Sequence, residues 1–214
     1  MGINIAIDGP AGAGKSTIAK KVAKELSFIY VDTGAMYRAM ALYLLEKGIS
    51  GDEKISEACH DADISIRYEN GEQQVILNGK NVTAFLRKEE VGNMASVSSA
   101  NLKLQRNLAA ENNVVMDGRD IGTTILPNAE VKIFLTASAK TRASRRYLEL
   151  TEKGEACDMD EILKDIVDRD ERDMNRAVSP LKKAEDAVLV DSSEMGIDEV
   201  VESILSVYRK RVNG

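Results

Sequence analysis

A glycine-rich loop between an apolar strand and a helix, close to the N-terminus, constrains this chain most. Residues 3–8 are Ile-Asn-Ile-Ala-Ile-Asp, an apolar and β-branched run typical of a strand buried on both faces. Residues 9–17 follow directly as Gly-Pro-Ala-Gly-Ala-Gly-Lys-Ser-Thr, and residues 18–26 carry apolar side chains at helical spacing. Gly-x-x-x-x-Gly-Lys-Ser between a strand and a helix is the pattern of a phosphate-binding loop. The chain is therefore expected to bind a nucleoside triphosphate.

Each residue type in the loop suits a triphosphate. Glycines allow backbone conformations in which consecutive N–H groups point at phosphate oxygens, and the N-terminus of the following helix favours an anion. Lys15 is expected to reach the β- and γ-phosphates, and the Ser16 hydroxyl is expected to ligate Mg²⁺. The residues predicted to bind ATP in this loop are Gly9, Pro10, Ala11, Gly12, Ala13, Gly14, Lys15, Ser16 and Thr17.

Size and composition narrow the remaining possibilities. The chain has 214 residues, 43% of them hydrophobic and 30% charged, as in a globular protein. This length allows one domain with insertions or two small domains, and one domain over residues 1–214 is expected. No apolar run approaches the roughly 18 residues of a membrane span, and the N-terminal strand does not resemble an export signal, so we expect a cytoplasmic protein without a membrane partner. A net charge of −6 argues against general nucleic-acid binding. A monomer is the expected state.

Metal binding by cysteine and histidine is not expected. Cys59 and Cys157 lie far apart, and the only histidine, His60, could supply at most half of a zinc site together with its neighbour. Because the protein is acidic, any arginines that handle phosphate groups must gather locally.

A second strand and helix carry candidate anion-binding residues. A strand is predicted over residues 28–31, and a helix over residues 35–45. Asp32 or Thr33 could simply cap that helix, so capping and ligand binding both remain open for Thr33. Arg38 follows within the first turns of the helix, where its side chain can face an anion over the C-terminal edge of the sheet.

Residues 51–112 interrupt the alternation of strands and helices. Strand patterns over residues 64–68 and 74–77 flank a turn and predict a hairpin, which is antiparallel and cannot continue a parallel sheet. Helical patterns follow over residues 82–87 and 91–112. We therefore expect an insertion into the domain at this place.

Three further strands complete the expected sheet, over residues 113–116, 131–136 and 187–193. Asp117 ends the first of them, and an aspartate in that position is expected to hold Mg²⁺ directly or through water, although aspartate is also a common helix cap. Strands that alternate with helices predict an α/β fold, a three-layer sandwich with five parallel strands and ligands over their C-terminal edge.

Three arginines follow the fourth strand at helical spacing. Arg142, Arg145 and Arg146 stand at i, i+3 and i+4, on one face of a predicted helix. Like charges this close repel one another unless something anionic lies opposite. A donor triphosphate is one candidate, and pairing with Glu149 and nearby carboxylates is the alternative.

These motifs together resemble bacterial cytidylate kinases, which belong to the superfamily of P-loop nucleoside monophosphate kinases. The resemblance rests on the phosphate loop, on Asp-Thr-Gly-Ala-Met-Tyr-Arg-Ala at residues 32–39, on Asp-Gly-Arg-Asp-Ile-Gly-Thr at residues 117–123, and on the charged stretch over residues 168–181. It spans nearly the whole chain. It implies the sandwich of that superfamily, with an enlarged monophosphate-binding insertion at residues 51–112 and a lid over residues 151–178.

The resemblance also implies an activity and roles for individual residues. The expected reaction is phosphorylation of CMP and dCMP by ATP, with Mg²⁺ as the cofactor. Asp120 would hold the acceptor ribose, and Asp173 would accept a hydrogen bond from the exocyclic amine of cytosine. The residues implied to bind CMP are Thr33, Arg38, Arg87, Arg119, Asp120, Arg169, Asp173 and Arg176. The catalytic set is Lys15, Arg119, Arg142, Arg146 and Arg176, with Arg145 assigned to ATP.

Two other functions remain open at this stage. A kinase of this kind could act on another nucleoside monophosphate or on a small metabolite, although Arg87 and Asp173 favour cytosine. A nucleotide-dependent switch that binds partners is the second alternative. Guanine-specific switches carry Asn-Lys-x-Asp after a strand, and the sequence contains no such motif.

Overall fold

The computed structural model describes residues 2–49, 61–69, 72–86, 102–176 and 179–212. The chain divides into two compact units. Residues 2–30 and 113–214 form one, called here the phosphate-loop unit, and residues 31–112 form the other, called here the insertion unit.

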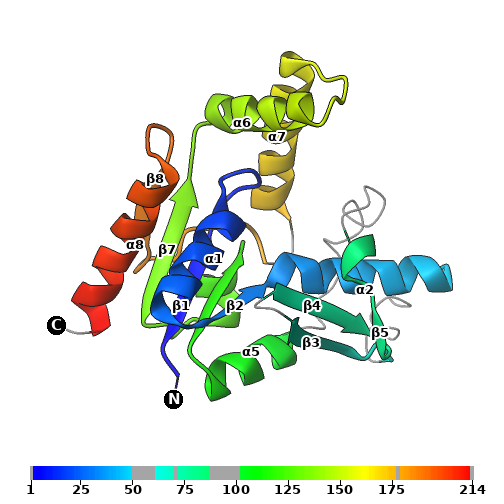
Figure 1. Ribbon diagram of the computed structural model, residues 1–214, viewed down its shortest axis with the longest axis vertical. Coiled ribbons are helices and arrows are strands. Elements are labelled where there is room, and N and C mark those ends of the chain that lie inside the picture. Colours follow the sequence, from blue (N-terminus) through cyan, green and yellow to red (C-terminus); the bar gives the residue numbers. More distant parts are fainter. Residues whose placement is uncertain (1, 50–60, 70–71, 87–101, 177–178, 213–214) are drawn as a thin grey trace. The chain divides into compact units, whose positions relative to one another are not determined.

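A five-stranded sheet carries the phosphate loop (Figure 1). Its strands, in spatial order, are β2 (Ile29–Asp32), β6 (Val114–Gly118), β1 (Asn4–Asp8), β7 (Val131–Thr136) and β8 (Val188–Asp191). β1 pairs in parallel with both β6 and β7, and β7 pairs in parallel with β8. The predicted five-stranded parallel sheet is confirmed. Because β1 is central, its apolar residues Ile5, Ala6 and Ile7 are fully buried, on both faces of the sheet.

The structure describes four α-helices in the phosphate-loop unit. They are α1 (Lys15–Leu26), α6 (Ala139–Glu152), α7 (Met159–Asn175) and α8 (Ile197–Val212). Ile18 and Val22 of α1 and Ile204 of α8 pack with the sheet strands in one apolar core. Each such side chain contributes about 1.5 to 3 kcal/mol by leaving water.

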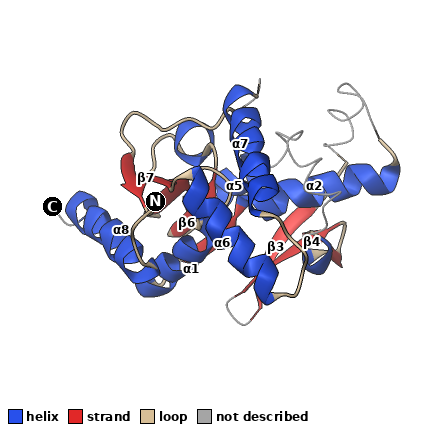
Figure 2. Cartoon of the chain, turned by 90° about the horizontal axis from the view of Figure 1, so that it is seen from above, coloured by secondary structure: helices blue, strands red, loops and turns tan. Residues whose placement is uncertain are grey.

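Helices α6 and α7 depend on polar contacts more than on a core. They lie side by side (Figures 1 and 2), and α7 has no buried residue. Asp158 caps α7, because its carboxylate accepts from the N–H groups of Asp160 and Glu161. The highly charged segment is thus a largely solvated helix, and its carboxylates Asp170 and Asp173 attach it to Arg142 and Arg119 of the same unit.

The insertion unit contains α2 (Thr33–Lys47), the strands β3 (Ile64–Glu69), β4 (Glu72–Leu77) and β5 (Lys80–Asn81), and α5 (Leu102–Glu111). Its core brings Met40 and Leu44 of α2 together with Val75 and Leu77 of β4. The antiparallel pairing of β3 with β4 confirms the predicted hairpin.

Two local expectations in this unit need correction or completion. Asn78 and Gly79 both have positive φ, which is the backbone of a tight hairpin turn, so a third strand, β5, pairs back onto β4. Of the helical pattern over residues 82–87, the structure describes residues 82–86. These form only a single 3₁₀ turn, Thr83–Phe85, because the Val82 N–H donates to the Val75 carbonyl and keeps the chain against the sheet. The second pattern is helical in its described part, α5. In the described ranges, none of the helices has the length and apolar character needed to cross a membrane.

Candidate nucleotide-binding site

The phosphate loop joins the end of β1 to α1 and requires glycine at defined positions. A Cβ on Gly9 would lie 1.9 Å from the Leu135 carbonyl oxygen of the neighbouring strand β7, and Gly9 has a φ of +152°. Gly14 caps α1 in the left-handed conformation, and Gly12 has a positive φ as well. The loop therefore takes a backbone that side chains would exclude.

Lys15 begins α1 and folds back over the loop. Its Nζ donates to the Pro10 carbonyl oxygen at 2.8 Å, and the residue is 8% exposed. Burial, helped by the nearby Arg119, lowers the pKa of the ammonium to about 8. One hydrogen bond occupies one of three donors, so the group keeps capacity for phosphate oxygens.

Ser16 and Asp117, predicted from separate motifs, are brought together. The Ser16 hydroxyl donates to Asp117 Oδ2 at 2.9 Å, and the Tyr30 hydroxyl donates to Oδ1 of the same carboxylate at 2.8 Å. The parallel pairing of β1 with β6 causes this, because it sets the ends of both strands at one edge. A hydroxyl and a carboxylate supply the oxygen ligands that Mg²⁺ prefers. Within the described ranges no cluster of three or more acidic, histidine or cysteine side chains could hold a metal.

The segment after β6 carries Arg119 and Asp120. The Arg119 guanidinium donates to the Asp173 carboxylate of α7. Asp120 is 2% exposed, and its Oδ1 lies 4.0 Å from Nη2 of Arg176. Its Oδ2 is buried without a hydrogen-bond partner in the part of the chain that the structure describes. Burial raises the pKa of this carboxyl, while Ser179 and the two arginines oppose the rise.

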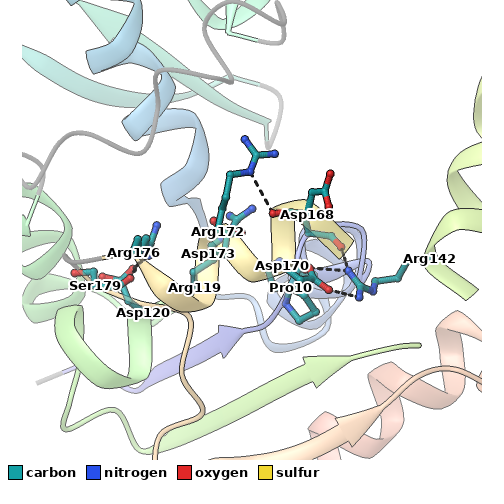
Figure 3. Close-up of polar contacts among 12 residues, drawn as sticks. Pro10, Arg119, Asp120, Arg142, Asp168, Asp170, Arg172, Asp173, Arg176 and Ser179 are labelled. Atoms are coloured by element: carbon teal, nitrogen blue, oxygen red, sulfur yellow. Dashed lines mark hydrogen bonds and ion pairs between the residues drawn. The ribbon is translucent and has the colours of Figure 1, made fainter. Parts of the chain in front are cut away.

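Arg142 connects three parts of the phosphate-loop unit, and Figure 3 shows its contact with Asp170 of α7. Its Nε donates to the Ala137 carbonyl at the end of β7, and its Nη1 donates to the Ala11 carbonyl of the phosphate loop at 2.9 Å. Nη1 and Nη2 also form a two-pronged pair with the Asp170 carboxylate of α7. The side chain is almost completely buried. Arg142 therefore ties the loop to α7.

The other two arginines of α6 take different partners, although all three share one stretch of helix. Arg145 donates to the Ser192 carbonyl at 2.7 Å, beyond the end of β8. Arg146 pairs with Glu149 on the helix surface, where both side chains are half exposed and such a pair contributes little. Pairing with carboxylates, the second interpretation given above, holds for Arg142 and Arg146. Arg145 instead reaches the C-terminal edge of the sheet, where the triphosphate is expected.

The remaining residues of α7 and its C-terminal end vary in their surroundings. The Arg176 guanidinium donates to the Ser179 carbonyl and also lies near Asp120, so it holds Ser179 close to Asp120 (Figure 3). Arg169 lies on the exposed side of α7. Asp173 is largely buried by its pairing with Arg119.

The candidates of the insertion unit surround the start of α2. Asp32 is the N-cap, because its carboxylate accepts from the Ala35 N–H at 2.8 Å, and Thr33 is the first, fully buried residue of the helix. Asp32 also lies 3.6 Å from Nη2 of Arg38, whose buried Nε has no hydrogen-bond partner among the described residues. Arg87 lies outside the described residues.

Sequence reasoning missed several polar residues of this region. Asp8 ends β1 and accepts two backbone N–H groups from the segment after Asp120; the logic that singled out Asp117, an aspartate ending a buried strand, applied to it as well. Tyr30 gave no signal, because a tyrosine on an apolar strand is ordinarily a core residue. Gln105 of α5 is fully buried, and its amide has no partner in the described part of the chain.

Comparisons with known proteins give the same name repeatedly. A family model described as cytidylate kinase matches residues 5–210. The chain is 49% identical to a cytidylate kinase of Caldicellulosiruptor bescii, over 98% of this chain and 97% of that one. It is 48% identical to a cytidylate kinase of Listeria monocytogenes serovar 1/2a, over 99% and 98% of the two chains.

Solved structures support the fold alone. A shikimate kinase from Acinetobacter baumannii in complex with shikimate has a TM-score of 0.50 at 15% identity, covering 100% of this chain and 97% of that one. An uncharacterised protein from Eubacterium ventriosum has a TM-score of 0.53, also at 15% identity, covering 95% and 96%.

Proposed function

The chain belongs to the cytidylate kinase family, and from this premise we propose that it transfers the γ-phosphoryl group of ATP to CMP and dCMP. The products are ADP and the cytidine diphosphate. The observation that carries the proposal is the meeting of the phosphate loop, Asp117 and the Arg119–Asp120 pair at the ends of adjacent strands. We also propose that the enzyme is a cytoplasmic monomer.

The donor side is supported by the loop and its two polar neighbours. The loop N–H groups and the Lys15 ammonium would bind the β- and γ-phosphates, and Ser16 with Asp117 would hold Mg²⁺ directly or through water. Such an ion would supply positive charge that offsets the negative charge of the transferred group. Tyr30 and Ser16 each donate to one oxygen of Asp117, which holds that carboxylate in a single orientation.

The acceptor side is supported by buried polar atoms that find no partner among the described residues. Asp120 Oδ2 is one of them, and burying such an oxygen unpaired is costly, so a ribose hydroxyl that donates to it would remove the penalty. Arg38 Nε is another, and a phosphate oxygen would satisfy it. Each of the two atoms belongs to a residue proposed to bind CMP.

The arginines balance the charge of two polyanions. Asp173 of α7 holds the Arg119 guanidinium next to Asp120, where the acceptor would bind. Asp170 of α7 holds the Arg142 guanidinium against the phosphate loop. The acceptor phosphate oxygen is already anionic and attacks the γ-phosphorus in line, so no protein nucleophile is required. Closure of the lid over residues 151–178 would exclude water, which could otherwise accept the phosphoryl group.

The test is ADP release with ATP and Mg²⁺ and a panel of acceptors: CMP, dCMP, UMP, AMP and dTMP. We expect turnover with CMP and dCMP and weak turnover with UMP. Asp173→Asn should relax the preference for cytosine, whereas Asp168→Asn, the same charge change on the exposed side of α7, should leave it unchanged. Tight ATP binding without turnover of any acceptor would contradict the proposal and favour a switch or a metabolite kinase.

A further inference from the structure

Asp8 is a buried carboxylate that neither the phosphate-loop pattern nor the proposed reaction uses. It is the last residue of β1 and is 4% exposed. Its Oδ1 accepts the Ile121 N–H at 2.8 Å, and its Oδ2 accepts the Gly122 N–H at 2.7 Å. Both donors open the short π-helix Ile121–Ile125, directly after the proposed acceptor residues.

The chemistry of this contact requires a carboxylate. Two consecutive N–H groups at the start of a helical turn have no partner within the turn, and a carboxylate accepts both, one on each oxygen. Charge-assisted bonds of this kind are roughly twice as strong as neutral ones. Asp8 is in none of the ion pairs found among the described residues. Burial raises the pKa of its carboxyl to about 6, and the nearby Asp120 contributes to this rise. The Gly122 and Ile121 N–H groups and, to a smaller extent, Lys15 oppose it. The two N–H bonds are thus its main compensation.

Gly122 lies close to Asp8, with little room for a side chain between them. A Cβ on Gly122 would lie 3.3 Å from Asp8 Oδ2 and 3.2 Å from Cδ of Lys132. The carboxylate and the buried stem of Lys132 thus enclose Gly122, and the backbone after Asp120 has little freedom to move.

The pairing of β1 with β6 connects this contact to the acceptor residues. Asp8 stands opposite Gly118 in the parallel pairing of β1 with β6, so the strand that leads into the phosphate loop also holds the segment that leaves β6. We propose that Asp8 is a positioning residue for the acceptor: its two hydrogen bonds hold the backbone after Asp120 and thereby aim Arg119 and Asp120 at the nucleoside monophosphate. This inference rests on the proposed function, in which those two residues bind the acceptor.

The test separates acceptor binding from donor binding. Asp8→Asn keeps the shape, but its amide accepts one N–H group and opposes the other. We expect the KM for CMP to rise at least tenfold, while the Kd for ATP, measured by calorimetry without acceptor, changes less than twofold. Gly122→Ala, which disturbs the same contact from the other side, should likewise raise the KM for CMP and leave the Kd for ATP nearly unchanged. Asp198→Asn, an exposed carboxylate of the same unit, is the matched control and should change neither constant.

Asp120→Asn, measured beside these variants, distinguishes two kinds of failure. If it raises the KM for CMP and the Asp8 and Gly122 variants do not, the positioning role is wrong and the proposed function stands. If Asp120→Asn leaves that KM unchanged, the acceptor site itself is wrong, and the inference falls with it. A comparable loss of ATP affinity in Asp8→Asn would overturn the inference by assigning Asp8 to the phosphate loop. Should Asp8→Asn fail to fold, Gly122→Ala decides.

Discussion

Replacing Lys15 by methionine should make the protein more stable at neutral pH while it abolishes most of the activity. The ammonium of Lys15 is buried, and its pKa falls from 10.5 to about 8. A fall of that size corresponds to about 3 kcal/mol of unfavourable free energy for keeping the group charged in the folded protein at pH 7. Methionine has a similar length and no charge.

The net gain is smaller, because the substitution also removes a hydrogen bond. The Pro10 carbonyl loses its donor, which costs about 1 to 2 kcal/mol. Lys15→Met should therefore raise the free energy of unfolding by about 1 to 2 kcal/mol at pH 7. Loss of a group that stabilises the transferred phosphate should lower kcat by at least about 100-fold.

The pH dependence identifies the cause. Between pH 8 and 10.5 the unfolded chain keeps a proton on Lys15 that the folded chain has lost, so the stability of the unsubstituted protein rises with pH relative to the variant. The advantage of Lys15→Met should shrink by about 2 kcal/mol between pH 7 and pH 10 and disappear.

The measurement is urea unfolding of both proteins at the two pH values, with slopes and midpoints fitted together. Lys21→Met, an exposed lysine of the same helix, should change stability by less than about 0.5 kcal/mol at either pH. If Lys15→Met destabilises the protein equally at pH 7 and pH 10, the buried ammonium is fully compensated and the reasoning fails.

Three further substitutions test particular contacts. Gly9→Ala should cost at least about 3 kcal/mol of unfolding free energy in the same assay, because its Cβ would lie 1.9 Å from a backbone carbonyl oxygen of β7; a smaller loss would mean that the loop relaxes. Asp170→Asn should cost about 1 to 3 kcal/mol by weakening the pair with the buried Arg142, against less than about 0.5 kcal/mol for Asp168→Asn on the same helix. Tyr30→Phe should reduce the Mg²⁺-dependent part of ATP affinity in calorimetry and leave affinity without the metal unchanged; a loss in both would indicate a packing role.

Local sequence patterns predicted what lies along one continuous stretch of chain. The phosphate loop is such a stretch, because the strand, the glycines and the helix that binds the anion follow one another within residues 3–26. The hairpin of β3 and β4 was predictable for the same reason. The third strand, β5, was not, since two residues carry no periodicity.

Partnerships across the chain depended on the order of the strands. Ser16 and Asp117 were each predicted, and they meet because β6 pairs with β1 in parallel register. The same pairing places Asp8 against the segment after Asp120, a contact that no motif marks.

The arginines of α6 illustrate the difference most directly. Helical spacing correctly set Arg142, Arg145 and Arg146 on one stretch of helix. Long side chains with several rotatable bonds then reached three different partners, and the choice of Asp170 for Arg142 came from the packing of α7. The sequence by itself determined which segments form strands, helices and the phosphate loop, because those depend on neighbouring residues. Only the tertiary structure decided which polar groups share a charge or a hydrogen bond, because those depend on distances between segments a hundred residues apart.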